Sequence, residues 1–299
     1  MDAPTELFQQ HRPRLLGLAY RMLGTQADAE DVLHDAWLRW HAQDQAGLDD
    51  AEAWLVTVTT RLALDRLRHA KVEREHYTGP WLPEPLVEPE AQPDSQAEQA
   101  QTLTHSFLLM LERLSPEERA AFLLREVFDY SHAEAASILG ITEESCRQRS
   151  HRAKQRLREE RVRFSANTQT QRRLLERFAL ALRRPSEENL RALLSEDAIQ
   201  VADGGGLVAA TLRPLLGSER ITRLYLQIHK HEQGHDIRRD LRVVNGEPAL
   251  LTWVDGQLTT VVWIECDGER ITALHALRNP QKLARLAAVT KSPAGSSLH

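Results

Sequence analysis

Residues 131–158 read SHAEAASILGITEESCRQRSHRAKQRLR, and this stretch predicts a short helix, a tight turn and a longer basic helix. Ser131 and Glu134 form a capping-box pattern at the start of the first helix, and Gly140 is typical of the residue that ends one. Thr142 is placed to cap the second helix, with acidic residues in its first turn, where the helix dipole favours them. A short helix joined to a longer basic one in this way is the pattern of a helix-turn-helix.

The longer helix carries the side chains best suited to reading duplex DNA. Residues 145–163 hold eight basic side chains against two acidic ones. Arginine and glutamine can bond two atoms of a base edge in the major groove, and early positions of such a helix reach bases, whereas later ones more often meet phosphates. The predicted DNA-binding residues are Arg147, Gln148, Arg149, His151, Arg152 and Lys154. The alternative is an ordinary solvated basic face.

Length and composition limit the class of protein. The chain has 299 residues, 41% of them apolar and 27% charged, which is typical of a soluble protein with about two domains. With 38 basic residues against 43 acidic ones, a basic coat over the whole surface is excluded, so any nucleic-acid surface must be local. No run approaches the roughly 20 apolar residues of a membrane-spanning helix, and neither a secretion signal nor a disulfide framework is visible. We therefore expect a cytoplasmic protein with no membrane partner.

Proline and charge divide the chain. Residues 77–101 contain five prolines and five acidic side chains but no basic one, which predicts an acidic, mostly non-helical linker. The predicted divisions are a helical domain at 1–76, this linker at 77–101, a helix-turn-helix domain at 102–163, a different domain at 167–290 and a disordered tail at 291–299. Trp81 and Leu82 are apolar, and a mere spacer does not need them. We expect the linker to dock there, although exposed apolar residues are also common.

The first domain is predicted to be all-α. Apolar residues recur at helical spacing from Leu15 to Leu23 and from Val32 to Trp40. A third run extends from Ala51 to about Arg74. It includes Val56–Thr60, whose alternation and β-branched side chains would suit a strand. The spacing of the leucines that follow favours a helix over the whole run.

The region from Asn167 onward is predicted to be α+β. Leu174–Leu182 and Ile221–Ile228 have helical apolar spacing. Strands are predicted at 243–244, 249–254, 258–264 and 271–277, because the dipeptides between them, Asn245-Gly246, Asp255-Gly256 and Asp267-Gly268, are hairpin-turn signals. Helices followed by an antiparallel meander indicate an α+β domain.

Two sets of motifs resemble one known family. The first set is Asp28-Ala29-Glu30-Asp31-Val32, Ala36-Trp37-Leu38-Arg39, Trp54-Leu55 and Leu64-Asp65-Arg66-Leu67-Arg68, which is similar to the second conserved region of extracytoplasmic-function sigma factors. The second set, Leu114-Ser115-Pro116-Glu117-Glu118-Arg119 with the helix-turn-helix through His151-Arg152-Ala153, is similar to their fourth conserved region. The resemblance implies a factor that binds core RNA polymerase and directs promoter recognition and transcription initiation.

The resemblance also implies partners for particular residues. An acidic helix would bind the basic clamp helices of the polymerase through Asp28, Glu30, Asp31 and Asp35. The minus-ten promoter element would be opened and held by Trp54, Thr57, Thr60, Arg61 and Arg68, by base stacking and phosphate contact. The basic helix would read the minus-thirty-five element, and the acidic linker would follow the polymerase active-site channel.

Three further motifs are similar to a subgroup with a fused SnoaL-like C-terminal domain. They are Tyr77–Pro85 (YTGPWLPEP), Asp203-Gly204-Gly205-Gly206 and Asn279-Pro280-Gln281-Lys282-Leu283. The predicted regulatory contacts between this domain and the sigma regions or linker are Trp81, Leu82, Pro83, Asp203, Gly204, Gly205, Gly206, Asn279 and Pro280. Leu207 stands where the subgroup usually has a basic residue, and Gln281 where it usually has aspartate. The fold class implied is two all-α sigma domains plus an α+β, cone-shaped SnoaL-like barrel.

Two other functions remain open from the residues. A one-component helix-turn-helix regulator would use the tail to sense a small molecule, but it leaves the acidic helix and the Trp54 region unexplained. A SnoaL-like isomerase or cyclase would place Tyr225, Trp253, Trp263 and His275 around a pocket, and Asp203 or His275 would be the candidate base. No acid/base pair with matched surroundings is recognisable, so we predict no catalysis.

We predict no cofactor and no metal. Asp203–Gly206 lacks the Lys-Ser/Thr of a P-loop and the spacing of a dinucleotide fingerprint. His229, His231 and His235 are close in sequence, but Gly234 predicts that their helix ends before the last of them. The resemblance leaves open an unidentified small ligand in the C-terminal pocket.

Overall fold

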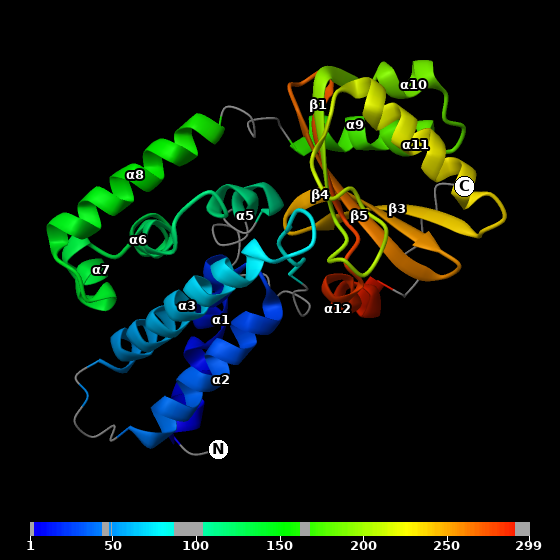
Figure 1. Ribbon diagram of the computed structural model, residues 1–299. Coiled ribbons are helices and arrows are strands. Elements are labelled where there is room, and N and C mark those ends of the chain that lie inside the picture. The colour runs from blue at the N-terminus through cyan, green and yellow to red at the C-terminus, as the bar shows by residue number, and fades with distance from the viewer. Residues whose placement is uncertain (1–2, 44–47, 49, 87–103, 162–167, 291–299) are drawn as a thin grey trace. The chain divides into compact units, whose positions relative to one another are not determined.

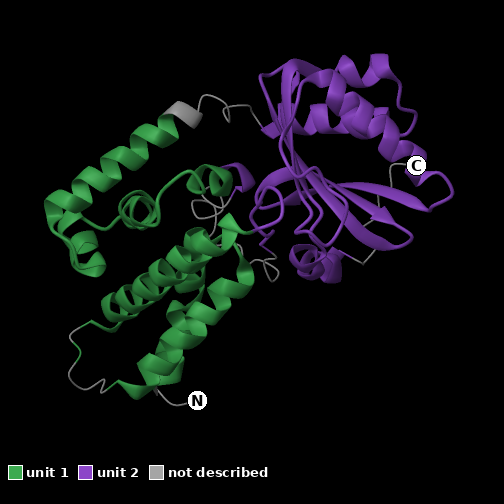
Figure 2. Ribbon diagram, in the orientation of Figure 1, with its two compact units in different colours: residues 1–76, 107–160 green, residues 77–106, 161–299 purple. Residues whose placement is uncertain are grey.

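A computed structural model describes residues 3–43, 48, 50–86, 104–161 and 168–290 (Figure 1). Contacts between residues divide the chain into two compact units, residues 1–76 with 107–160 and residues 77–106 with 161–299 (Figure 2). The start of the predicted linker therefore groups with the C-terminal domain. The predicted tail at 291–299 and linker residues 87–101 lie outside the described residues.

The first half of unit 1 is three helices, α1 (Ala3–Leu23), α2 (Gln26–Ala42) and α3 (Ala51–Glu75). Thr25 and Asp50 cap α2 and α3 with their side chains, as the preference for such residues at helix starts requires. The Val56–Thr60 segment is helical, because helical spacing places its apolar side chains with Leu64 and Leu67 in one buried stripe. Strand propensity is overridden there by packing.

The second half of unit 1 contains α5 (His105–Leu111, whose first two residues group with unit 2), α6 (Pro116–Glu126), α7 (His132–Leu139) and α8 (Glu143–Arg161). Both capping boxes form, Ser115 with Glu118 and Ser131 with Glu134. Gly140 ends α7 at φ 65°, a left-handed conformation that glycine adopts without strain. The α7–turn–α8 segment is the predicted helix-turn-helix.

Unit 2 contains α9 (Thr168–Ala181), α10 (Glu187–Arg191), α11 (Ser218–Glu232), α12 (Pro280–Thr290) and one six-stranded sheet. The strands are β1 (Leu194–Asp203), β2 (Leu215–Leu216), β3 (Ile237–Val244), β4 (Glu247–Val254), β5 (Gln257–Cys266) and β6 (Ile271–Leu277). Their order in the sheet is β2-β1-β6-β5-β4-β3. The meander β3–β6 was predicted. The strand β1, which pairs in parallel with β6, was not.

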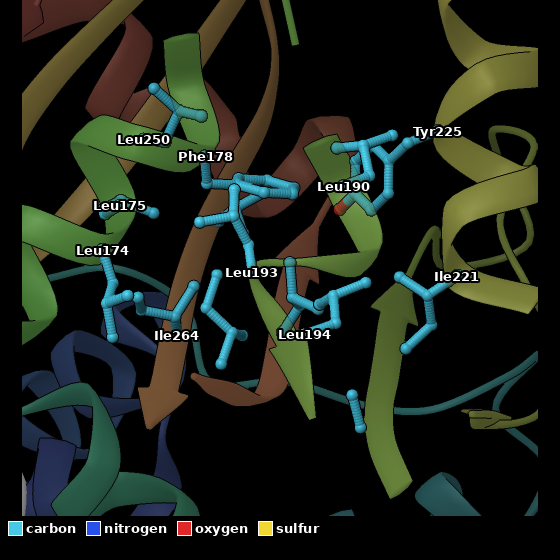
Figure 3. Close-up of a cluster of buried hydrophobic side chains, with 14 of the residues drawn as sticks. Leu174, Leu175, Phe178, Leu190, Leu193, Leu194, Ile221, Tyr225, Leu250 and Ile264 are labelled. Carbon is cyan, nitrogen blue, oxygen red and sulfur yellow. The ribbon is translucent and has the colours of Figure 1, made fainter. Parts of the chain in front are cut away.

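The two faces of this sheet have different surroundings. Side chains that alternate toward α9, α10 and α11 form an apolar core with Phe178, Leu190 and Tyr225 (Figure 3). The opposite face carries Asp203, Trp263 and His275. His275 of β6 is the register partner of Val201 in β1 and of Trp263 in β5, so these side chains share that face. The C-terminal domain is therefore an α+β fold, as the resemblance to SnoaL-like domains implies, with a filled core on one face of the sheet and a row of polar and aromatic side chains on the other.

No helix in the described part of the chain is long and apolar enough to span a bilayer.

Candidate functional site

The basic helix α8 presents its polar side chains outward. One stripe of α8 is buried against the rest of unit 1, with residues recurring every three or four positions: Cys146, Ser150, Ala153 and Leu157. Burial raises the pKa of the Cys146 thiol, so this side chain is a neutral core group. The predicted DNA-binding side chains lie away from this stripe: Arg147, Gln148, His151, Arg152 and Lys154 are exposed, and Arg149 is half-buried.

Two of the predicted DNA-binding cations of α8, Arg147 and Lys154, have accessible acidic partners, whereas Arg152 lies 3.8 Å from the buried Glu118 carboxylate. Arg147 pairs with Glu143 at 2.6 Å one helical turn away, and the Lys154 ammonium lies 2.8 Å from Glu126. Exposed pairs of this kind contribute only about 0.3–0.5 kcal/mol. Exchanging such partners for DNA phosphates or base edges costs little, so these contacts leave the helix available for DNA.

The predicted minus-ten residues on α3 differ in accessibility. The Trp54 ring packs on Trp40 with 5.5 Å between centroids, and the half-buried Thr57 hydroxyl donates to the Ala53 carbonyl at 2.7 Å. Thr60 corrects the expectation of an accessible side chain, because it is fully buried. The physical reason is its helical spacing from Val56 and Leu64, which places all three on the inward face.

Two α3 arginines bind the other half of unit 1. Arg61 donates to the carbonyls of Ile138 and Ser137 in α7, at 2.9 and 3.2 Å. Arg68 contacts Glu117 of α6 at 3.0 Å and Asp65 at 2.9 Å. In this conformation both guanidinium groups are engaged by the helix-turn-helix half or by α3 itself. Contact with promoter DNA would require them to exchange partners.

The acidic residues of α2 also fall into two groups. Asp31 and Asp35 are exposed. Asp28 instead contacts the Thr25 hydroxyl that caps the helix and pairs with Arg66 at 2.8 Å, and this hydrogen bond raises the pKa of the arginine. Glu30 is half-buried and accepts from Gln26 at 3.2 Å. The side chains most accessible to a basic partner are thus Asp31 and Asp35.

In unit 2, Asp203 is the centre of a linker-binding site, which we define as Asp203, Asn279 and Lys282. The carboxylate has no exposed surface and accepts from the Tyr77 hydroxyl at 2.6 Å and from the Leu82 N–H at 2.9 Å. It also accepts from the Gly205 N–H at 3.1 Å. A buried carboxylate needs several such donors, and the linker provides two of them.

Lys282 completes the charge balance of this site. Its ammonium lies 2.7 Å from Asp203 and donates to the Leu82 carbonyl at 2.7 Å. It also lies 4.1 Å from the centre of the Trp81 ring, within cation–π range. The linker thus supplies both hydrogen-bonding groups and an aromatic face to the buried pair.

The backbone around the site is shaped for close approach. Asn279 caps α12, because its side chain accepts from the Gln281 N–H at 3.0 Å, and its amide donates to Tyr77 at 2.9 Å. Gly205 has φ 62°, and a Cβ there would clash with the Asn279 amide. A Cβ at Gly206 would lie 3.0 Å from Thr78. Glycine at these two positions lets the linker and α12 meet the turn.

The other predicted regulatory positions lie around this site. Leu82 and Pro83 are buried, and Trp81 is half-buried over the Lys282 ammonium. Pro280 is the exposed first residue of α12. A Cβ at Gly204 would lie 2.6 Å from the Val208 carbonyl, so this glycine shapes its own turn. Leu207, at the usual basic position of the subgroup, is exposed.

Several residues that hold the linker were not predicted from the sequence. Tyr77 and Lys282 stood inside quoted motifs, but only their contacts reveal their roles. Farther along the linker, the Leu86 N–H donates to the Asn245 side chain at 2.8 Å, and at the start of α5 the Ser106 N–H donates to Glu247 at 3.2 Å. The only sequence signal at Asn245 was its turn dipeptide. It predicted a hairpin and not a ligand for another segment.

The four side chains considered for a catalytic pocket do not line one cavity. Tyr225 packs edge-on against Phe178 in the apolar core, and burial raises its pKa. Trp263 and His275 are register partners on the opposite face of the sheet, because alternate strand residues point to opposite sides. Trp253 also lies on that opposite face, where Arg238 covers its ring at 4.6 Å. No cluster of three or more His, Cys, Asp or Glu side chains suited to a metal occurs among the described residues.

Comparison with known proteins agrees with this arrangement. The Sigma-70 region 2 model matches residues 7–72, and the Sigma-70 region 4 model matches residues 104–157. The chain is 33% identical to the ECF RNA polymerase sigma factor SigJ of Mycobacterium tuberculosis over 92% of this chain and 91% of the relative. It is 28% identical to a probable ECF sigma factor, SigI, of the same organism, over 96% and 97%. The crystal structure of SigJ superposes with a TM-score of 0.72 at 32% identity, covering 97% of this chain and 99% of that one.

A helix-turn-helix with a basic outer face, joined to a three-helix domain with an acidic helix, defines a sigma-70-type factor. More narrowly, the chain belongs to the ECF RNA polymerase sigma factors. Such a factor recognises promoters and directs transcription initiation by RNA polymerase. The match to region 2 accounts for the acidic helix and the Trp54 region, which a one-component regulator left unexplained.

Proposed function

We propose that the C-terminal domain regulates this sigma factor by binding the linker between its two sigma regions. The observation that carries the proposal is the buried Asp203 carboxylate, which accepts hydrogen bonds from Tyr77 and Leu82 of the linker. A linker held this way is withheld from the polymerase channel that the family resemblance assigns to it. The domain acts without catalysis, as a built-in partner of the linker.

Covalent fusion favours this mechanism. A binding partner on a short tether experiences an effective concentration of about 1 mM, so contacts of modest affinity keep the linker bound. The polymerase can still compete, because Asp31 and Asp35, the exposed acidic residues proposed to bind it, lie outside the linker. Binding of α2 to a basic polymerase surface is supported by the exposure of Asp31 and Asp35, and binding of α8 to the minus-thirty-five element by its exposed basic side chains.

Run-off transcription with core RNA polymerase tests the regulatory role. Tyr77→Phe removes the hydroxyl that donates to Asp203, and Tyr225→Phe is the matched control because it makes the same change on the other face of the same domain. We expect Tyr77→Phe, but not Tyr225→Phe, to change promoter-directed run-off yield and polymerase affinity. Deleting residues from about Ser165 onward should change them further. If full-length, Tyr77→Phe and truncated proteins all behaved alike, the domain would have no regulatory role.

A further inference from the structure

His105, the first residue of α5, packs on the C-terminal domain. This side chain is 1% exposed, and its ring lies flat on the Trp263 indole, with 3.8 Å between centroids and 7° between planes. The His105 N–H donates to the Asn245 carbonyl at 3.3 Å, next to the bond between Ser106 and Glu247. One stacked ring and two backbone donors therefore hold residues 105–106 on the face of the sheet that carries Trp263 and His275.

The polar atoms of this ring are poorly satisfied. Within the described part of the chain, neither ring nitrogen of His105 has a hydrogen-bond partner, and the Nδ1 of His275 also lacks one. The two imidazoles lie 6.1 Å apart at 60°, a geometry without a direct bond. The tight fit thus comes from stacking and burial, and not from hydrogen bonds to the ring.

The charged groups that face His105 come from three strands. Glu247 on β4 accepts the Ser106 N–H, while Glu265 on β5 is bound to the Nε2 of His275 on β6 at 2.6 Å. Both carboxylates are thus engaged elsewhere. Burial, and then the charge of His275, lowers the pKa of His105 well below its usual value, so the bound ring is neutral.

We propose that the His105 contact is acid-sensitive: protonation of this imidazole releases residues 105–106 from Trp263 and the strand face. The inference goes beyond the proposed regulation, because it concerns what detaches this segment and not what detachment does to transcription. A bound imidazolium would be a buried charge without a partner, whereas the released ring is solvated by water.

The direction of the pH effect follows from linkage. Because the bound pKa is below the released one, the contact is fully stable above the ordinary histidine pKa of about 6.5 and weakens as the pH falls through it. The released form then gains protons that the bound form cannot accept. Between pH 7.5 and 5.5, this shifts the opening equilibrium by about tenfold.

Hydrogen–deuterium exchange of the full-length protein tests the contact. The readout is protection of the amides at 105–106 at pH 7.5 and 5.5, corrected for the intrinsic pH dependence of exchange. We expect about tenfold more opening at the lower pH in the wild type and in His231→Phe, an exposed control on α11. In His105→Phe, which keeps an aromatic ring but cannot be protonated, the change should fall below twofold. A wild-type-sized pH effect in His105→Phe would overturn the proposal.

A second measurement does not depend on a variant that folds. Nuclear magnetic resonance titration of the wild-type histidines should show His105 titrating below its ordinary pKa, together with exchange broadening of the Ser106 amide on acidification. A His105 that titrates at or above about 6.5 would contradict the proposal. Neither measurement involves polymerase or promoter, so their failure is distinguishable from failure of the regulatory role.

Discussion

The helix α8 and the linker-binding site both depend on charged side chains, but they use them under opposite conditions. On α8, Arg147 is 56% exposed and pairs with a glutamate of its own helix. In the C-terminal domain, Asp203 is fully buried and contacts Lys282, Tyr77 and Leu82. Exposed pairs contribute little and exchange readily, whereas removing one member of a buried pair leaves an uncompensated charge. The charged side chains of α8 can therefore exchange partners at little cost, whereas those of the linker-binding site cannot.

The largest expected effect is that of Asp203→Ala, which removes the carboxylate of the buried Asp203–Lys282 pair. The change leaves the Lys282 ammonium buried without its carboxylate, and we expect a loss of about 3–5 kcal/mol in the free energy of unfolding. Urea denaturation of the full chain measures it. Asp197→Ala, an exposed aspartate on the same strand, is the matched control and should change stability by less than about 0.5 kcal/mol. Equal effects of the two variants would mean that the buried pair adds nothing.

The next effect is steric. Gly205→Ala places a Cβ against the Asn279 amide in a left-handed backbone, so we expect a loss of about 2–3 kcal/mol, from backbone strain and overpacking together. Gly234→Ala has the same kind of backbone at φ 93° but no atom within 4 Å of the new Cβ, and it should cost only about 1 kcal/mol. The difference in thermal unfolding between the two isolates the fit of the linker-binding site. A difference of zero would show that this close packing is not required.

On the exposed surface of α8, Arg147→Ala tests whether this side chain reads a promoter base. If the guanidinium bonds a base edge in two places, its loss costs about 1–3 kcal/mol of holoenzyme binding at matched promoters and relaxes the preference at one base position. Binding to a series of single-base promoter variants measures this. An unchanged preference across the whole series would remove Arg147 from base recognition. Protein stability should hardly change, since the pair with Glu143 is exposed.

The smallest expected effect belongs to Lys154→Ala. A phosphate contact at this position weakens binding to all promoter sequences alike and reduces the slope of log affinity against log salt by about one unit. Affinity at several salt concentrations is the measurement. A sequence-dependent loss would instead assign Lys154 to base reading.

The sequence was most informative where local chemistry decides structure. The capping boxes at Ser115 and Ser131 and the turn at Gly140 predicted the helix-turn-helix, because helix ends are determined by neighbouring residues. At Val56–Thr60 strand propensity conflicts with the helical spacing of apolar residues, and the helix predicted from that spacing is the structure observed. Strand β1 escaped prediction because its parallel partner β6 is about 70 residues away and no turn connects them.

The candidate sites were predictable to a smaller extent. Motifs indicated Asp203 and Asn279, but the choice of Tyr77 as their partner depends on a contact across more than 100 residues. The burial of Thr60 and the pairing of Asp28 with Arg66 likewise depend on how helices pack. Spacing places a side chain on a helix face, but it does not say whether that face meets solvent.

Asn245 holds both ends of one chain segment. Its side chain accepts from the Leu86 N–H at 2.8 Å and its carbonyl accepts from the His105 N–H at 3.3 Å, so two residues 19 positions apart in sequence are bound to a single turn. Because asparagine here adopts φ 49°, glycine could replace it and keep the turn while removing only the amide bond to Leu86. One side chain thereby anchors Leu86, and its removal would leave the bond from the His105 N–H to the backbone carbonyl of residue 245 in place.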